Sequence, residues 1–227
     1  MSHPPGNEIY RHDDKLSIWE VDGEKESLYC ENLCLLSKCF LDHKYLGAEI
    51  SPFLFYILTD FDINGHHIVG YFSKEKMSDK GYNLSCILVL PFYQKKGFGK
   101  FLIAFSYELS LLEGRAGTPE VPLSDLGFRT YFSYWTQVIV KYLLEYKKEE
   151  VSVKEICEHT GITYEDIFKV LERLNILRYN QGQHRIFAEK KFLENLYATS
   201  GEKFQKIKRE NLHWVPYVSI IQKAAQN

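Results

Sequence analysis

The sequence lacks long apolar runs and a strong charge of either sign. No stretch approaches the roughly 20 apolar residues that a bilayer-spanning helix needs, and the first residues do not follow the pattern of a signal peptide. Lys and Arg number 28 and Asp and Glu 30, which leaves a net charge of −2. These absences argue against a membrane protein and against one that coats nucleic acid through bulk charge. Internal repeats and low-complexity segments are also missing.

Cysteine is scarce, with five residues among 227. An odd number in a chain long enough to bury a sizeable core favours a reducing, intracellular compartment. Cys30, Cys34, Cys39 and His43 resemble a zinc-binding set in spacing. However, we expect one helix over residues 31–42, on which Cys34 and Cys39 lie about 140° apart. We therefore assign no metal site and interpret these cysteines as packing residues.

Hydrophobic residues make up 45% of the chain and aromatic residues 15%, which suffices for one or two domains. Hydrophobic periodicity and turn residues predict a series of short elements. They are strands at 17–21 and 27–30, a helix at 31–42, strands at 53–59 and 67–72 around a turn at 62–65, an apolar strand carrying Cys86, a helix that stops at Gly114, an extended loop at 118–123, and a helix capped by Ser124 or Asp125.

A charged stretch at residues 146–150 marks a predicted subdomain boundary. Beyond it, residues 153–159 and 164–174 have a helix–turn–helix pattern, and strands at 177–179 and 184–187 complete a small winged-helix shape. The second helix is net acidic and therefore unsuited to phosphates; its charged residues are Glu165, Asp166, Lys169, Glu172 and Arg173. We expect structural packing against the first half and no sequence-specific DNA binding.

The most informative stretch is the apolar run 83–91, which a basic, glycine-bearing turn at 94–100 connects to a long helix. Such a turn directs backbone N–H groups and the positive end of a helix dipole at one place, which suits a pyrophosphate. The turn lacks the earlier glycine and the hydroxyl of a P-loop. Leu102 occupies the third glycine position of a dinucleotide fingerprint. The spacing instead fits the phosphate-binding turn of acetyl-CoA-dependent acyltransferases.

The chain resembles the MYST family of histone acetyltransferases over essentially its whole length. The segments that carry the resemblance are 3–10 (HPPGNEIY), 32–36 (NLCLL), 41–44 (LDHK), 52–56 (PFLFY), 69–76 (VGYFSKEK), 93–100 (YQKKGFGK), 105–110 (FSYELS) and 122–127 (PLSDLG). The resemblance implies an α+β fold. Residues 1–147 would form a GNAT-like acetyl-CoA-binding core with a mixed central sheet, and residues 148–227 a winged-helix-like subdomain.

The implied reaction moves an acetyl group from acetyl-CoA to a lysine ε-amine. A lysine of pKa about 10.4 is almost wholly protonated at pH 7, so exposing its lone pair costs about 4.6 kcal/mol. A positioned base is typically worth roughly 10²–10⁴ in rate. The local sequence, a glutamate between two prolines, indicates that Glu120 is a solvated charge in a loop. The resemblance instead implies that Glu120 is the catalytic glutamate. Cys86 matches the active-site cysteine. It would either accept the acetyl group covalently or only shape the pocket, and we favour the second role.

The resemblance also implies a set of cofactor contacts. Backbone of the strand would meet the acetyl and pantetheine arm, the turn would bind the pyrophosphate, and two serines would add contacts. These residues are Ile87, Leu88, Val89, Gln94, Lys95, Lys96, Gly97, Phe98, Gly99, Lys100, Ser124 and Ser133. Val89 stands where the family usually has threonine, and Phe92 where it has proline or glutamine. In the MYST family a zinc finger precedes the segment that matches residues 3–8, and we expect either that it was trimmed or that this lineage lost it.

The resemblance implies a nuclear chromatin enzyme that acetylates histone tails, works within a multi-subunit complex and contacts no membrane. Acetylation of non-histone proteins or small amines is one alternative. A silent chromatin scaffold is another, although its expected sign, the loss of Glu120 or of the glycine turn, is not seen.

Lys44 matches the family lysine that acetylates itself near the substrate channel. We therefore expect an acetylated Lys44 peptide in mass spectra of active protein. The same peptide should stay unmodified in a Glu120→Gln preparation, because the carboxylate that deprotonates the incoming amine is then missing. Equal acetylation of the two preparations would contradict this assignment.

Overall fold

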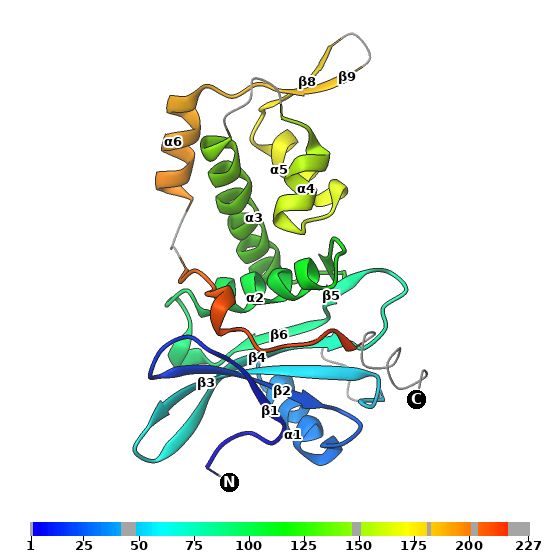
Figure 1. The fold of residues 1–227 in the computed structure, drawn as a ribbon, viewed down its shortest axis with the longest axis vertical. Helices are drawn as coiled ribbons and strands as arrows, with labels where there is room; N and C mark the ends of the chain where they lie inside the picture. Colours follow the sequence, from blue (N-terminus) through cyan, green and yellow to red (C-terminus); the bar gives the residue numbers. More distant parts are fainter. Residues whose placement is uncertain (1, 42–48, 147–150, 181–182, 201–203, 218–227) are drawn as a thin grey trace.

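The computed structural model describes residues 2–41, 49–146, 151–180, 183–200 and 204–217 (Figure 1). The strands are β1 (Asn7–Arg11), β2 (Leu16–Asp22), β3 (Phe53–Asp62), β4 (Gly65–Glu75), β5 (Tyr82–Leu84), β6 (Cys86–Val89), β7 (Thr118–Pro119), β8 (Leu177–Asn180) and β9 (Gln183–Ile186). The helices are α1 (Ser27–Lys38), α2 (Phe98–Leu112), α3 (Asp125–Glu145), α4 (Val153–Thr160), α5 (Tyr164–Arg173) and α6 (Lys190–Thr199), with 3₁₀ turns η1 (Pro91–Tyr93) and η2 (Arg209–Asn211). The predicted α+β composition is confirmed.

Five strands form the central sheet in the order β1-β2-β3-β4-β6. Each neighbouring pair is antiparallel, so the prediction of a mixed central sheet is wrong for the strands that the structure describes. The turn between Asp62 and Gly65 is too short for anything but an antiparallel hairpin. Among the described residues, parallel pairing is limited to β5 with β7 and a bridge between Gly117 and Ile162.

The sheet is covered by α1 on one face and α2 on the other (Figure 1). Alternating residues of β3 serve the two faces, as the two-residue period of a strand requires. Phe55 and Ile57 pack in the α1-side core, whereas Leu54, Tyr56 and Leu58 pack in the α2-side core. Full burial of one such side chain stabilises the fold by about 1.5–3 kcal/mol. No helix in the described part of the chain combines the length and apolarity needed to cross a membrane.

The first helix begins earlier than the sequence predicted. Residues 27–30, expected as a strand, are the first turn of α1, and the helix ends at Lys38. The physical reason is that Cys30, Leu33, Cys34 and Ser37 lie on one buried helix face, so residue 30 continues the helical period. Cys39 follows the helix and is exposed. His43 lies outside the described residues.

The part after α3 contains the predicted helix–turn–helix and strand pair, as α4, α5 and the β8–β9 hairpin. Ser152 and Glu155 form a capping box that fixes the start of α4. Ile156, Ile167 and Val170 from α4 and α5 belong to the same hydrophobic cluster as α2 and α3. The predicted packing against the first half is therefore confirmed.

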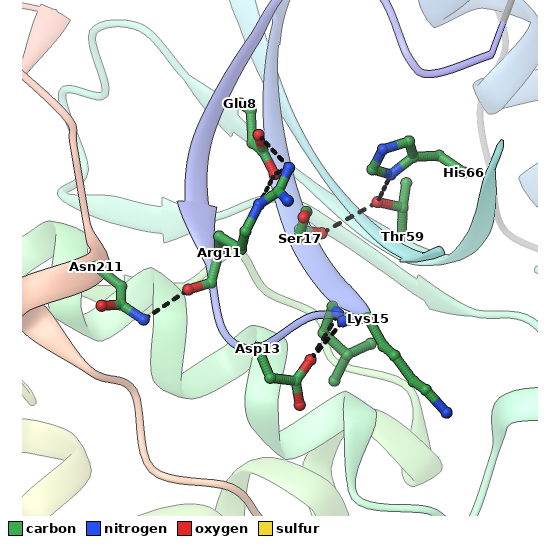
Figure 2. A network of polar contacts seen from close by, with 9 residues as sticks. Glu8, Arg11, Asp13, Lys15, Ser17, Thr59, His66 and Asn211 are labelled. Carbon is green, nitrogen blue, oxygen red and sulfur yellow. Dashed lines mark hydrogen bonds and ion pairs between the residues drawn. The ribbon is translucent and has the colours of Figure 1, made fainter. Parts of the chain in front are cut away.

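Residues 204–217, the return segment, run back from the upper helices to the sheet (Figure 1). The Trp214 indole donates to the Glu20 carboxylate at 2.6 Å. The Asn211 side chain donates to the Arg11 carbonyl at 2.7 Å, as Figure 2 shows. The return segment thus ties the end of the described chain to β1 and β2.

His12 generates a testable pH dependence. Its ring is buried, with Nδ1 2.7 Å from the Tyr10 hydroxyl. Burial lowers the pKa of His12 below its ordinary value, so the unfolded chain binds a proton that the folded protein resists. Above the ordinary histidine pKa, His12 does not oppose folding. As the pH falls below that value, proton binding favours the unfolded chain and the free energy of unfolding falls. We expect the free energy of unfolding to fall between about pH 7.5 and about pH 5.5, and to fall less in His12→Gln. Urea denaturation at each pH measures this, and equal slopes in the two proteins would contradict it.

Candidate active site

The apolar run around Cys86 is divided between two sheets. β5 pairs with β7, whereas β6 pairs with β4. Ser85 lies at the division, and its amide donates to the Ser73 carbonyl at 2.8 Å, which brings the chain into register with β4. Cys86 is therefore the first residue of β6, and the prediction of one apolar strand around it is wrong, because that run is divided into β5 and β6.

The Cys86 thiol is half-buried and lies beside the Tyr71 hydroxyl. Burial, followed by the adjacent thiol, raises the pKa of Tyr71 well above its ordinary value. The Tyr71 hydroxyl also contacts the Ser37 hydroxyl on α1. Tyr71 is uncharged at neutral pH, so this neighbour supplies no positive charge to stabilise a Cys86 thiolate.

Glu120 follows β7, the short strand that runs parallel to β5. Its amide donates to the Leu84 carbonyl at 2.9 Å. This bond places the backbone of Glu120 two residues from Cys86, although α2 separates the two in the chain. The Glu120 side chain is exposed. The structure thus brings the two candidate catalytic residues to the same edge of the sheet.

The loop that carries Glu120 borders a cavity of about 500 Å³, within the range of small-ligand sites. Residues before and after Glu120 contribute to one wall, and α3 and α5 form the others. The lining residues are Thr118, Pro119, Val121, Leu123, Asp125, Phe128, Arg129, Trp135, Asp166, Lys169 and Arg173.

The glycine turn follows β6 after Leu90 and the 3₁₀ turn η1. The Gln94 side chain donates to the Val89 carbonyl at 3.0 Å and so closes the turn onto the end of that strand. Lys95 and Gly97 have positive φ of 59° and 85°, a backbone conformation that turns successive N–H groups toward one side. α2 then starts at Phe98, and the first N–H groups of any helix have no partner within it.

The three lysines near this turn are placed differently. Lys95 and Lys96 are exposed, and the Lys96 ammonium lies 5.6 Å from the centre of the Tyr93 ring. Lys100 is only 8% exposed, within the first turn of α2. Gly99 faces Val89 and Thr130, since a Cβ there would lie 3.7 Å from the Thr130 methyl group. Charge at the surface of the turn therefore comes from Lys95 and Lys96.

The two serines also differ. Ser124 caps α3, with its hydroxyl accepting from the Gly127 amide at 3.1 Å, as predicted. Ser133 lies more than two turns further along α3 and donates to the Ser200 carbonyl at 2.5 Å. Ser124 therefore lies at the start of α3, near the loop of Glu120, whereas Ser133 joins α3 to the end of α6.

These residues fit acetyl-CoA. The two positive-φ residues and the start of α2 offer backbone donors to a pyrophosphate. β6 is the last strand of the sheet, so its outer edge offers peptide groups to the amides of a pantetheine arm. Gly99 adds no side chain to the first turn of α2, where a Cβ would contact Thr130 and Val89. In the described residues, no group of three or more His, Cys, Asp or Glu side chains could hold a metal ion.

The profile of the MOZ/SAS family matches residues 3–212. The chain belongs to the MOZ/SAS family. Histone acetyltransferase ESA1 of Candida glabrata is 53% identical to it over 218 residues, covering 96% of this chain and 48% of that protein. Histone acetyltransferase of the MYST family 2 of Arabidopsis thaliana is 51% identical over 217 residues, covering 96% and 48%. Histone acetyltransferase Tip60 homolog of Caenorhabditis elegans is 49% identical over 222 residues, covering 95% and 48%. The predicted MYST resemblance is confirmed, and the chain spans about half the length of these relatives.

Two residues near the site of this MOZ/SAS chain were missed by sequence reasoning. Tyr71, beside Cys86, carried no signal because its position in an apolar strand resembles plain core. Asp166 was counted as a surface charge of α5, but it is only 1% exposed and accepts a hydrogen bond from Thr118, two residues before Glu120. Lys44, the predicted autoacetylation site, lies outside the described residues.

Gly99→Ala separates cofactor binding from folding. The added methyl group has room in the protein, and alanine favours a helix over glycine by up to about 1 kcal/mol. We expect an unchanged or higher melting temperature but an affinity for acetyl-CoA at least about tenfold weaker, because the methyl group is added within the first turn of α2, whose N–H groups would bind the pyrophosphate. Thermal denaturation and isothermal titration calorimetry measure the two effects. Wild-type affinity in this variant would remove the start of α2 from the binding site.

Proposed function

We propose that this protein is a histone lysine acetyltransferase, with acetyl-CoA as donor and Glu120 as general base. One observation carries the proposal. The hydrogen bond from the Glu120 amide to the Leu84 carbonyl, 2.9 Å long, holds the backbone of Glu120 beside a residue two positions before β6, and the glycine turn lies beyond the other end of that strand. On this proposal, the base and the pyrophosphate site would lie toward the two ends of one four-residue strand. The names of the relatives supply the substrate class.

Acetyl-CoA supplies the acetyl group as a thioester. Glu120 takes one proton from the lysine ε-ammonium, which exposes the nitrogen lone pair for attack on the thioester carbonyl carbon. A C–N bond forms and the C–S bond breaks, the attacking nitrogen loses its second proton, and the leaving coenzyme A thiolate takes up a proton and departs as the thiol. Without a base, the free-amine form costs about 4.6 kcal/mol at pH 7, so a positioned carboxylate removes a substantial part of the barrier.

Direct attack by the lysine is the mechanism we favour, with Cys86 shaping the pocket. A covalent acetyl-cysteine would need an activated thiolate. Cys86 lies beside the neutral Tyr71 hydroxyl, and its sequence neighbours Ser85 and Ile87 are uncharged. Among the described residues, these three neighbours supply no positive charge to the thiol.

Cofactor binding would be divided between strand, turn and helix. Peptide groups of Ile87, Leu88 and Val89 would contact the acetyl and pantetheine arm. The turn from Gln94 to Lys100 would bind the pyrophosphate, with Lys95 and Lys96 adding charge, and Ser124 and Ser133 would supply further contacts. Lys44 would be the site of autoacetylation.

The remaining proposals concern organisation and context. Residues 1–147 would act as the catalytic core and 148–227 as a winged-helix-like subdomain, based on α4, α5 and the β8–β9 hairpin. We further propose work in the nucleus within a chromatin-modifying complex, since the relatives are histone acetyltransferases.

Substitution of the two candidate residues tests the mechanism. We expect Glu120→Gln to fold and bind acetyl-CoA but to lose roughly 10²–10⁴ in transfer rate at neutral pH, because the base is gone. Cys86→Ala should keep most of its activity. The measurement is transfer of labelled acetyl groups to core histones, followed by mapping of the modified lysines.

Polyamines in place of histones provide the substrate control. Faster transfer to polyamines than to histone peptides would replace the histone assignment with a small-amine one. Near wild-type activity in Glu120→Gln would exclude this residue as the base. An acetylated Cys86 that passes its acetyl group on would establish the covalent route.

A further inference from the structure

The segment 117–120, which ends at Glu120, is hydrogen-bonded on two sides. On the side of the sheet, the Thr118 amide donates to the Gly81 carbonyl at 3.4 Å, and the Glu120 amide donates to the Leu84 carbonyl at 2.9 Å. These bonds fix the register of the segment relative to β5. They leave its other edge facing α4 and α5.

The opposite edge is bonded to the second half of the protein. The Gly117 amide donates to the Gly161 carbonyl at 2.8 Å, and Gly117 forms a parallel bridge with Ile162. The Thr118 hydroxyl donates to the carboxylate of Asp166 at 2.7 Å. The segment therefore behaves as a strand shared by two halves of the molecule.

Asp166 is built into this junction as a buried charge. It is 1% exposed, and Oδ2 accepts from both the Thr118 hydroxyl and the Thr163 hydroxyl, the latter at 3.0 Å. Its other oxygen, Oδ1, accepts from the Lys169 ammonium at 2.8 Å. Hydrogen bonds to a charged group are roughly twice as strong as those between neutral groups. Thr163 precedes α5 without capping it through its side chain, so its hydroxyl is directed to Asp166 instead.

Close packing restricts the movement of segment 117–120. A Cβ on Gly117 would lie 2.6 Å from the Asn83 side chain, so the backbone of Gly117 packs against this residue of β5. Asn83 is itself buried and donates to the Ser110 hydroxyl of α2 at 3.1 Å. Two residues of extended chain span at most about 7 Å, so Thr118 and Glu120 cannot move independently.

We propose that Asp166 is a positioning residue for Glu120. It holds the Thr118 hydroxyl from the side of α5, while β5 holds the Glu120 amide, and together they fix where the carboxylate meets the incoming ε-amine. The inference rests on the proposed role of Glu120 as base. The second half of the chain would then contribute to catalysis through α5. A shift of the Glu120 carboxylate by about 1 Å can lower the rate of acetyl transfer about 100-fold.

A matched pair of variants separates positioning from stability. Thr118→Val removes the hydroxyl that links the segment to Asp166 and keeps the shape of the side chain. Thr163→Val removes the other hydroxyl on the same carboxylate oxygen, but that bond lies within the start of α5 and joins no second element. We expect kcat for histone peptides to fall by about 10- to 100-fold in Thr118→Val and by less than about twofold in Thr163→Val. Thr118→Ser should restore most of the rate.

The pH profile provides a readout that loss of stability would not change. A misplaced base matters less as the substrate lysine deprotonates by itself. The kcat deficit of Thr118→Val should therefore shrink as the pH rises from about 7 toward the ordinary lysine pKa of about 10.4. The KM for acetyl-CoA should stay unchanged, because the glycine turn is not part of the segment.

Hydrogen exchange tests whether Asp166 holds segment 117–120, and it does so without an activity measurement. Amides of segment 117–120 should exchange at least about fivefold faster in Thr118→Val than in wild type or Thr163→Val. An unchanged kcat in Thr118→Val, an equal loss in both valine variants, or equal exchange in all three proteins would overturn the role of Asp166. A wild-type protein without acetyltransferase activity would overturn the proposed function instead, and the exchange result would still show whether Asp166 holds the segment.

Discussion

The hydrogen bond between the Glu120 amide and the Leu84 carbonyl, 2.9 Å long, joins the parts of the candidate site. β6 alone would present Cys86 at one end and the glycine turn at the other, without Glu120. The parallel pairing of β5 and β7 places the loop that follows α2, and with it the backbone of Glu120, next to β5. Since Ser85 ends one pairing and starts the next, a single residue lies between the strand that holds Glu120 and the strand that begins with Cys86.

Buried charges occur where the elements around this site meet. Lys74 of β4 is 2% exposed and forms an ion pair with Glu113 at the end of α2, while Arg115 contacts the same carboxylate at 2.8 Å. Burial lowers the pKa of Lys74, and Glu113 opposes this shift. A buried pair contributes little net stability, but removal of one partner is costly, so such pairs favour one arrangement over others. Lys74 with Glu113 fixes the end of α2 on the sheet, as Asp166 with Thr118 fixes the segment before Glu120.

Several elements were predictable because their signals are local. The hairpin of β3 and β4 follows from two apolar strands around Asp62 to Gly65, and the start of α3 follows from Ser124 as a cap. The prediction for residues 27–30 was wrong because four residues are too few to separate a strand period from the first turn of a helix. The run through Cys86 was predicted as one strand because its apolar character continues across Ser85, and nothing in the local sequence shows that the strand partner changes there.

The sequence by itself determined the family, the positions of the glycine turn and the proline-flanked loop, and the residue types available for the chemistry, because motifs and periodicity are properties of neighbouring residues. Only the tertiary structure decided that Glu120 lies beside β6, that Lys100 is buried while Lys95 is exposed, and that Asp166 faces Thr118 instead of solvent. Each of these depends on packing between segments far apart in the chain, and the free energy of such contacts leaves no periodic trace in the sequence.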